Sequence, residues 1–284
     1  MPENSATSNK SMCSIHYSYS SYSKSISNCR SRLILACLTI VLFFQGTDSK
    51  AQSSEPRPFQ FSGIITATSN GVSLIPSFTL GRPAVFFDLS LGGERLSFDP
   101  MFRFGMDGKP WSFVFWGRYK LIKDSRFTLN VGAHPAFIFQ ERTFMVNGKE
   151  EIMMAAQRFF AGEIVPMYKV SDRFSIGIYY LQGRGFNPIP PKNSNFLALN
   201  TVFSGLPIYK DVTLRMNPQL YFLRVDENTG TYVVSSFTLT KKDFPVGIQT
   251  LFNQKIKSQV AGDDLVWNVG LVYNFSKEFN KTKN

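Results

Sequence analysis

The residue types that most often carry out nucleophilic catalysis are scarce in this chain of 284 residues. Its two histidines are His16 and His134, and its three cysteines, Cys13, Cys29 and Cys37, all lie near the amino terminus. A serine hydrolase needs a histidine within hydrogen-bond reach of the serine hydroxyl. No serine stands within two residues of His134, although a serine from another part of the fold could approach it. An enzyme is therefore the weakest of the three functional hypotheses developed below.

Acidic residues could hold only a hard cation, because no cysteine follows residue 51 and oxygen ligands suit calcium or magnesium. The pairs Asp263-Asp264 and Glu150-Glu151 lie in predicted connections, where solvated loop charge is the ordinary explanation. The stretch Asp226–Gly230 lacks the remaining ligands of a calcium loop. Gly183–Asn187 is not a phosphate-binding loop, since no strand-to-helix transition follows it. We therefore expect no metal ion and no cofactor.

The elements that must position any site show a two-residue alternation. In the segment 111–121, Trp111, Phe113, Phe115, Tyr119 and Leu121 fall on one face, and Ser112, Arg118 and Lys120 fall on the other. Side chains of a strand point alternately to opposite faces, so such a segment separates an apolar environment from a polar one. The pattern predicts strands at about 71–80, 83–92, 95–105, 110–121, 126–142, 155–170, 173–183, 195–208, 211–226, 230–241, 244–257 and 264–275.

Short turns and longer connections alternate along these segments. The short turns are rich in Gly, Asp and Ser and lie at 92–94, 123–125, 171–173, 209–211 and 241–243. With twelve strands, both chain ends and all the short turns fall at one end of the sheet. The segment 59–68 is left over and could be a further strand, pair at the rim or enter the interior, so ten or fourteen strands remain alternatives.

A membrane β-barrel and a soluble β domain both alternate, but they differ in which face meets water. Here the apolar phase is strongly aromatic, with further rings near strand ends at Trp111, Tyr119, Phe174, Tyr180, Tyr221 and Tyr273. That distribution is typical of an outward apolar band with aromatic girdles. The prediction is an all-β fold: a transmembrane, antiparallel, up-and-down barrel of about twelve strands.

The amino-terminal part of the chain predicts export. Arg30 and Arg32 precede an apolar run from Leu33 to Phe44, which is too short to span a bilayer as a helix. We expect residues 1–51 to be a cleaved signal peptide, 52–70 a periplasmic or plug segment, 71–275 the barrel and 276–284 a polar tail. Removing the five basic and two acidic residues of the leader lowers the formal charge from +11 to about +8. These charges form no basic run, which argues against nucleic acid as a partner.

The last predicted strand resembles the carboxy-terminal strand of Gram-negative outer-membrane β-barrel proteins. It reads Leu-Val-Trp-Asn-Val-Gly-Leu-Val-Tyr-Asn-Phe over residues 265–275, and Tyr273 and Phe275 match the aromatic positions of that family. The resemblance implies an outer-membrane location, contact with outer-membrane lipids and lipopolysaccharide, and recognition of these two residues by the barrel-assembly machinery. The tail after Phe275 departs from many members, which end on the aromatic residue. In the lipid hydrolases of that group a His-x-Ser motif is common. In a motif of this kind that ended at Ser69, the histidine would be residue 67, which is Ala67.

The polar phase of the predicted strands gives the candidate lumen. Charges inside a barrel need partners or water, so they either pair across a narrow lumen or line an aqueous path. We expect a restricted channel for passive passage of small anionic or neutral solutes. The alternative is a barrel that serves as an anchor and presents external loops, chiefly 183–195, for adhesion. A lipid-modifying enzyme ranks third. The predicted lumen-lining residues are Asp88, Asp99, Arg103, Arg118, Lys120, His134, Glu163, Arg215, Asn217 and Gln219.

Overall fold

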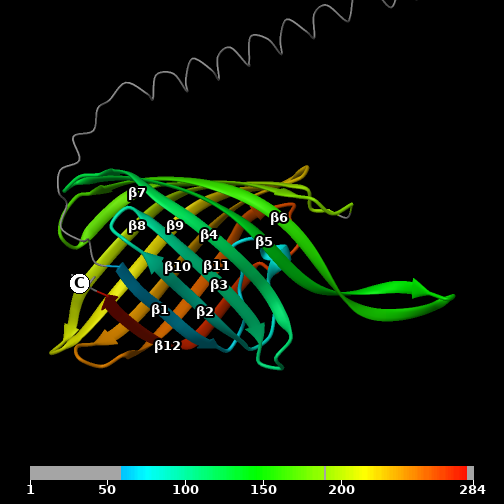
Figure 1. Ribbon diagram of the computed structural model, residues 1–284, viewed down its shortest axis with the longest axis horizontal. Helices are drawn as coiled ribbons and strands as arrows, with labels where there is room; N and C mark the ends of the chain where they lie inside the picture. The colour runs from blue at the N-terminus through cyan, green and yellow to red at the C-terminus, as the bar shows by residue number, and fades with distance from the viewer. Residues whose placement is uncertain (1–58, 189, 280–284) are drawn as a thin grey trace, which may run out of the picture. The chain divides into compact units, whose positions relative to one another are not determined.

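The computed structural model describes residues 59–188 and 190–279, and its strands form one closed barrel (Figure 1). Each strand pairs antiparallel with its neighbours in sequence, and the first strand pairs with the last. The expected fold class and strand number are confirmed. The predicted signal peptide lies outside the described residues. The strands are β1 (Phe59–Thr68), β2 (Ala84–Gly92), β3 (Leu96–Gly105), β4 (Pro110–Lys123), β5 (Phe127–Val146), β6 (Lys149–Lys169), β7 (Phe174–Gly185), β8 (Asn193–Tyr209), β9 (Val212–Val225), β10 (Asn228–Lys241), β11 (Val246–Ser258) and β12 (Leu265–Phe279).

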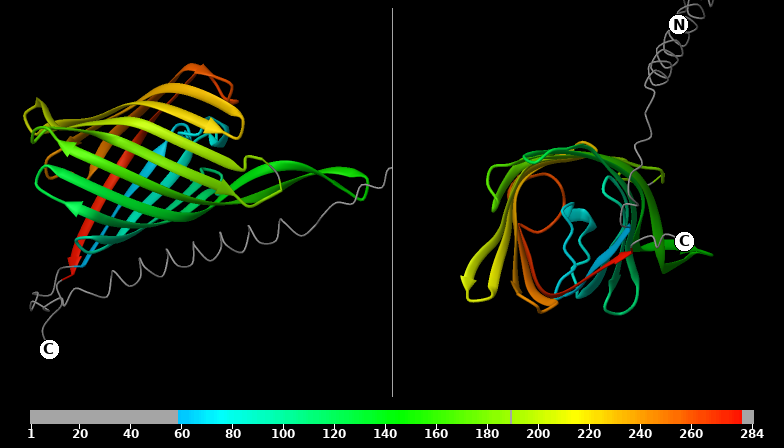
Figure 2. Two further views of the ribbon diagram at one scale, coloured as in Figure 1. Left: turned by 90° about the horizontal axis from the view of Figure 1, so that it is seen from above. Right: turned by 60° about the vertical axis from the view of Figure 1, so that its left-hand side comes forward.

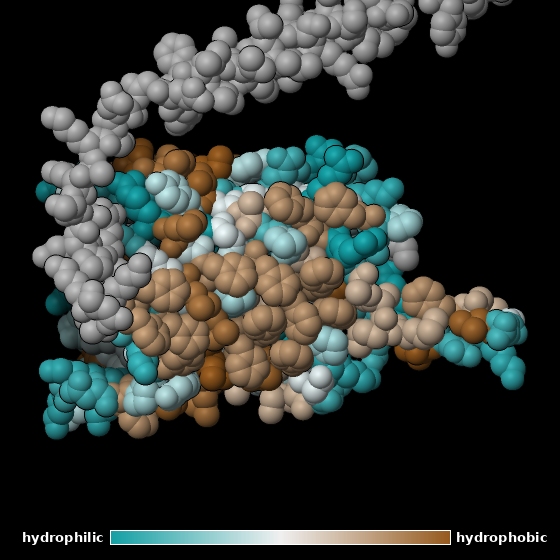
Figure 3. Space-filling model, in the orientation of Figure 1, coloured by the Kyte–Doolittle hydropathy of each residue, from teal (hydrophilic) through white to brown (hydrophobic). Residues whose placement is uncertain are grey.

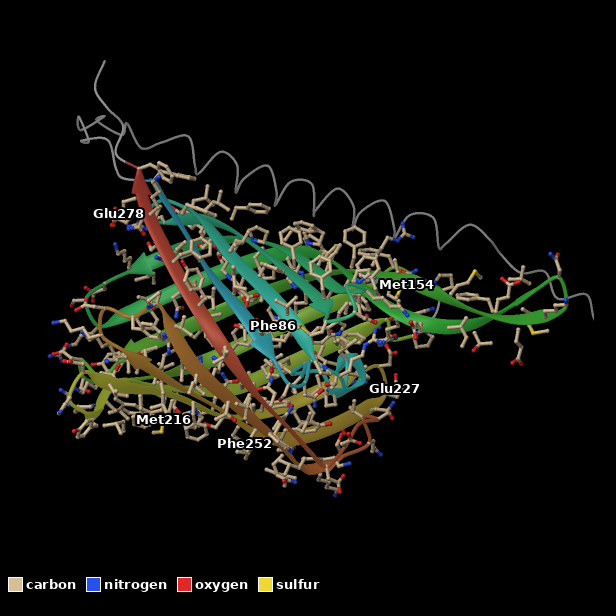
Figure 4. All side chains as sticks on the ribbon, turned by 90° about the horizontal axis from the view of Figure 1, so that it is seen from below. Phe86, Met154, Met216, Glu227, Phe252 and Glu278 are labelled. Atoms are coloured by element: carbon tan, nitrogen blue, oxygen red, sulfur yellow. The ribbon has the colours of Figure 1, made fainter. Side chains whose placement is uncertain are left out.

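The two ends of the barrel differ in their connections. Phe59 pairs with Phe279, so both described termini lie at one end, which we call the terminal end. The turns between β2 and β3, β4 and β5, β6 and β7, β8 and β9, and β10 and β11 are at this end and are short, as predicted. The opposite end, which we call the loop end, carries the other connections. Glu278 marks the terminal end and Glu227 the loop end in Figure 4.

The prediction for the start of the barrel was wrong. Residues 71–80 form no strand and hold only the short helix η1 (Pro76–Phe78), whereas 59–68 form β1. Gly71 and Pro76 interrupt the segment 71–80, which is followed by Gly81, with a φ of +74°, and by Pro83. β1 contains no proline, and its one glycine, Gly63, stays paired with both neighbouring strands; β1 closes the ring by pairing with β2 and β12. The barrel therefore begins at Phe59 rather than at residue 71, and one strand replaces another in the count.

The hairpin of β5 and β6 projects beyond the rest of the barrel at the loop end (Figure 1). These strands have 20 and 21 residues, and their pairing runs without a break to Val146 and Lys149. The two-residue turn Asn147-Gly148 has φ values of 51° and 75°, as hairpin turns that match the strand twist require. We expected these strands to end near 142 and to resume near 155, because the charged residues there suggested a loop. By contrast, the expected long loop at 183–195 is reduced to residues 186–192.

The outward face of the barrel is apolar and aromatic. In Figure 3 such side chains cover the middle of the visible face, and hydrophilic residues lie towards both ends. Among the described residues, no helix is long and apolar enough to cross a bilayer. Large hydrophobic side chains that are more than 40% exposed on this face include Leu197, Leu199, Leu220, Phe222, Ile248, Phe252, Trp267 and Leu271.

At the loop end, the inner wall formed by β8, β9 and β10 is apolar, which the sequence reasoning missed. Tyr221 and Tyr232 stack with ring centroids 4.8 Å apart, and Phe196 stacks on Tyr221 at the same distance. These rings belong to a buried cluster on β8, β9 and β10 that also includes Val260 from the β11–β12 loop. Tyr221 was expected among the outward girdle residues, which is wrong: it shares the inward face of β9 with Asn217 and Gln219.

Trp111 was also expected on the outward face, and the structure places it inside. Arg103 of β3 pairs with Ser112 of β4, and Phe104 pairs with Pro110, so Trp111 is the extra residue of a β-bulge. A bulge turns one side chain away from the regular alternation. Trp111 is 3% exposed, and its indole nitrogen donates a 2.8 Å hydrogen bond to the carbonyl oxygen of Phe78.

Candidate functional site

The connection between β1 and β2 folds into the barrel and narrows its loop end. The right-hand view of Figure 2 shows this segment, residues 69–83, inside the ring of strands, and we call it the inward loop. Tyr221 Oη donates to the Leu74 carbonyl oxygen at 3.1 Å, and Gln140 Nε2 donates to that of Ser77 at 3.2 Å. Together with the Trp111 bond to Phe78, these contacts tie the inward loop to three strands of the wall.

The lumen holds an ion-pair network whose side chains come from β2, β3, β4, β6 and β7. Arg118 Nη1 lies 2.9 Å from Asp99 Oδ2, and its Nε donates to Glu163 Oε1 at 2.7 Å. Tyr179 Oη donates to the other oxygen of Glu163 at 2.8 Å. The Ser90 hydroxyl donates to Asp99 at 2.6 Å. Glu163 is 4% exposed, and a carboxylate so buried is stable only with partners of this kind.

A glycine makes this network possible. Arg118 of β4 and Glu163 of β6 are not on adjacent strands, because β5 runs between them. Gly132 is the residue of β5 that pairs with both. A β-carbon at Gly132 would stand 2.9 Å from Glu163 Oε1 and 3.0 Å from Arg118 Cγ. The absence of a side chain there lets the two charged side chains meet over the strand.

His134 lies inside the barrel beside the network. Its ring packs against Trp116, with centroids 4.0 Å apart, and the Arg118 guanidinium lies 4.2 Å from the centroid of the same indole. The imidazole is buried, and its Nδ1 has no hydrogen-bond partner in the described part of the chain. No hydrogen bond joins it to a serine hydroxyl of the described residues, so the geometry offers no Ser–His pair.

Arg103 and Asp88 face the lumen without forming an ion pair with each other or with any other described residue. The Arg103 guanidinium lies 5.2 Å from the Phe86 ring centroid and 5.7 Å from that of Trp111. Its Nε and the Oδ1 of Asp88 are buried without hydrogen-bond partners. Arg103 is therefore a cation that lies beside two aromatic rings and is not paired with a carboxylate.

The remaining predicted residues lie apart from this network. Asn217 Nδ2 and Gln219 Nε2 both donate to Asn200 Oδ1, at 2.7 and 3.1 Å, so they form a polar patch on the β8–β9 wall. Arg215 follows the inward register of β9, and Lys120 that of β4, yet neither forms an ion pair with a described residue. The sequence placed all ten residues in one lumen but could not tell which of them touch.

Three cavities lie inside the barrel, and we name them by position. The first lies against β1–β4 and β12, the second against the inward loop and β3–β8, and the third against the inward loop and β4–β6. The terminal cavity has a volume of about 560 Å³ and is lined by Asp88, Asp99 and Arg118 among others. The middle cavity, of about 160 Å³, lies between the inward loop and the wall and is lined by Arg103 and His134. The loop-end cavity, of about 520 Å³, is lined by Arg82, Arg142, Phe78 and Trp111. Phe78 and Trp111 also line the middle cavity, so these two residues separate the last two spaces.

Arg82 and Arg142 are lumen residues that sequence reasoning missed. Arg142 continues the inward face of β5 beyond His134 and Gln140, and its guanidinium donates to Gln140 Oε1 at 3.3 Å. The two-residue alternation, extended from Gln140 to the next inward position of the same segment, would have identified Arg142. Arg82 belongs to the inward loop, and no pattern in the sequence indicated that this segment turns inside.

Metal ligands do not cluster in the described part of the chain: no group of three or more His, Cys, Asp or Glu side chains could hold an ion there.

Tyr273 and Phe275, the predicted assembly signal, lie on β12 with ring centroids 6.2 Å apart. Phe275 also packs edge-on against Phe61 of β1, at 5.5 Å. Both rings thus lie at the seam that closes the barrel.

Comparison with known proteins gives likenesses of structure alone. No family model matches the chain, and no curated protein matches it in sequence. A KdgM porin superposes with a TM-score of 0.46 at 11% identity, over 75% of this chain and 99% of the porin. An outer-membrane channel from Pseudomonas putida F1 gives 0.44 at 7% identity, over 82% and 99% of the two chains. OmpT, an outer-membrane protein of Vibrio cholerae, gives 0.38 at 8% identity, over 79% and 99%. At such scores these likenesses carry no argument about solute or activity.

Proposed function

We propose that this protein is an outer-membrane barrel that forms a narrow channel for small anionic or neutral solutes. The exported chain, after loss of its signal peptide, would insert among outer-membrane lipids and lipopolysaccharide. Tyr273 and Phe275 at the barrel seam would be read by the assembly machinery. A soluble protein rarely exposes a continuous apolar face of this kind, and the exposed Leu, Ile and Phe side chains of the exterior support contact with hydrocarbon instead.

The observation that carries the proposed selectivity is the distribution of arginines along the three cavities. Arg82 and Arg142 line the loop-end cavity, Arg103 the middle one and Arg118 the terminal one. A solute that moves from one end to the other would meet a guanidinium at each level. Two of the four, Arg103 and Arg142, form no ion pair with a described residue, so their charge is available to a passing anion.

The inward loop supports a small size limit. Its residues Ser73, Ile75 and Phe78 line the middle cavity, which at about 160 Å³ is the smallest of the three. The three hydrogen bonds that tie the loop to the wall hold it in place there. Solutes much larger than a single sugar or amino acid would not pass without displacement of the loop.

Conductance in a planar bilayer tests this proposal. In a salt gradient, the purified barrel is expected to show small conductance steps and a reversal potential that favours anions. Replacing Arg103 and Arg142 together by methionine should lower the anion preference. Arg158→Met, which removes a charge from the outward face of β6, is the matched control and should leave it unchanged. A barrel that does not conduct, or one that prefers cations, would contradict the proposal.

The β5–β6 hairpin favours a second candidate function, that of an anchor that presents an external segment to a binding partner. Its two strands extend beyond the barrel, and Met145 and Ile152 are 67% and 73% exposed. This hairpin replaces the 183–195 loop as the candidate binding segment. A whole-cell pulldown with and without residues 143–152 tests the anchor function: capture that is lost on deletion, from a barrel that does not conduct, would favour it over the channel.

A further inference from the structure

We propose that the middle cavity is a binding site for a small carboxylate that bears one apolar group about the size of a benzene ring. The inference deepens the proposed channel function, since it names the class of solute that would pause on its way through. It rests on the lining of one cavity and on two polar groups inside that cavity that lack partners. Neither feature is required for the strands to pair into a complete ring.

The lining of the middle cavity is mainly apolar. Its wall is built by residues of the strands from β3 to β8, and the inward loop closes the remaining side. A cavity of about 150 Å³ with such a lining is known to hold a benzene ring in another protein, and this one measures about 160 Å³. Small-molecule sites are typically apolar with a few placed polar groups. The apolar lining residues are Ile75, Phe78, Trp111, Val114, Ala136, Ile138, Phe159, Ala161 and Leu181.

Arg103 supplies the charge that a carboxylate needs. Its guanidinium lies against the faces of Phe86 and Trp111, at 5.2 and 5.7 Å from the ring centroids, and forms no ion pair with a described residue. Its buried Nε has no acceptor. A half-buried cation in apolar surroundings is stabilised when an anion joins it, and a carboxylate can accept two parallel hydrogen bonds from guanidinium.

His134 supplies a second polar group in the same cavity. It is 8% exposed, and its Nδ1 has no partner among the described residues. Its ring packs against Trp116, with centroids 4.0 Å apart and ring planes inclined at 60°, and this contact limits its rotation towards solvent. The hydroxyl-bearing residues Ser73, Ser112 and Ser194 complete the polar part of the lining.

The composition of the cavity argues against other anions and against cations. One unpaired guanidinium cannot balance a phosphate dianion, and the apolar wall leaves most hydroxyls of a sugar without partners. The acidic lumen residues Asp88 and Asp99 line the terminal cavity, and Glu163 is bonded to Arg118 and Tyr179; none of the three lines the middle cavity. A monocarboxylate with an apolar group can form an ion pair with Arg103 and pack its apolar group against the apolar lining residues.

Tryptophan fluorescence provides a direct test. Trp111 lines the cavity and Trp116 packs against His134, whereas the third tryptophan, Trp267, is 51% exposed on the outward face. A Trp267→Phe barrel in detergent therefore reports mainly from the cavity. Phenylacetate should give a saturable signal change, confirmed by equilibrium dialysis of the radiolabelled acid. Benzyl alcohol, which lacks the charge, and acetate, which lacks the ring, should each bind about tenfold more weakly or worse.

Variants then assign the charge to Arg103. Arg103→Met should weaken phenylacetate binding about tenfold or more, Arg103→Lys should retain part of the affinity, and Arg158→Met should change nothing. Circular dichroism checks that each variant is folded. If Arg103→Met does not fold, the comparison of phenylacetate with acetate and benzyl alcohol on the parent barrel decides alone. Equal affinity for the three probes, or no saturable binding, would overturn the inference.

The channel and the site can fail separately. A barrel that conducts anions but does not bind phenylacetate refutes the site and leaves the channel. A barrel that binds phenylacetate through Arg103 but never conducts refutes the channel and leaves the site as a closed binding cavity.

Discussion

Arg118 and Glu163 form a 2.7 Å ion pair across a strand to which neither of them belongs. The pair bridges β4 and β6 over Gly132 of β5, so side chains join these two strands inside the barrel, while β5 pairs with both through its backbone. Tyr179 on β7 extends the same connection through its bond to Glu163. The wall from β3 to β7 is therefore held by one continuous polar network.

Adding a methyl group to Gly132 should disturb this network. In Gly132→Ala the new carbon would meet Glu163 and Arg118 at about 3 Å, and moving either side chain breaks the ion pair. We expect the free energy of unfolding to fall by about 1–3 kcal/mol, as for other overpacked interiors. Urea titration of the barrel in phospholipid vesicles measures it.

Gly117→Ala is the matched control, since a β-carbon there would meet only the Ala133 carbonyl oxygen, at 3.9 Å. This change should be neutral or slightly stabilising, because alanine restricts the unfolded chain more than glycine does. If the two variants lose equal stability, the role assigned to Gly132 is wrong.

The bond from Tyr221 to the inward loop should restrict the channel. Tyr221→Phe removes the donor to the Leu74 carbonyl oxygen and the acceptor for Asn253 Nδ2, which lie at 3.1 and 2.8 Å. The loop would then be freer to leave the lumen, and we expect larger and noisier conductance steps in planar bilayers.

Tyr232→Phe is the control for this second prediction. Tyr232 stacks on Tyr221, but its hydroxyl bonds to the Ser258 hydroxyl at 2.6 Å and does not contact the inward loop. The Tyr232→Phe variant should conduct like the parent barrel. Larger steps in both variants would point to general loosening of the aromatic stack.

Truncating the projecting hairpin should not affect conduction. The pairs from Thr143 to Val146 of β5 with Lys149 to Ile152 of β6 lie beyond the part of the barrel that surrounds the three cavities. Deleting residues 143–152 and joining the strands with a short Gly-containing turn is therefore expected to leave conductance and ion preference unchanged. A changed ion preference would show that the hairpin folds back over the opening.

The architecture could be predicted because alternation in a barrel is repeated in every strand. Leu265, Trp267, Val269, Leu271 and Tyr273 are all exposed on β12, and residues between them are buried, as a period of two requires. A prediction that sums many such positions survives a local error. The replacement of the expected 71–80 strand by β1 illustrates this, since the number of strands did not change.

The internal contacts could not be predicted, because they depend on register and on single exceptions to the pattern. Trp111 faces inward only because one bulge separates it from Phe113. The meeting of Arg118 with Glu163 depends on Gly132 standing opposite both, and one residue of slip would remove it. The inward loop carries no periodicity at all, so its contacts with Trp111 and Tyr221 emerged only in three dimensions.

The membrane placement predicts a dependence of stability on depth along one strand face. Val233 and Leu239 both lie on β10, are 43% and 39% exposed, and share its outward face because they are six residues apart. Val233 is near the middle of the strand, whereas Leu239 is two residues from its end at Lys241. In a bilayer, an arginine at mid-depth of a barrel exterior costs about 2–4 kcal/mol, and one near the interface costs about 0–1 kcal/mol. Val233→Arg should therefore reduce the free energy of unfolding in vesicles far more than Leu239→Arg.

In water both positions would be ordinary surface, and an arginine at either would be tolerated or would improve solubility. Equal, small effects of the two substitutions, together with a barrel that stays monomeric without detergent, would refute the contact with hydrocarbon on which the proposed channel depends.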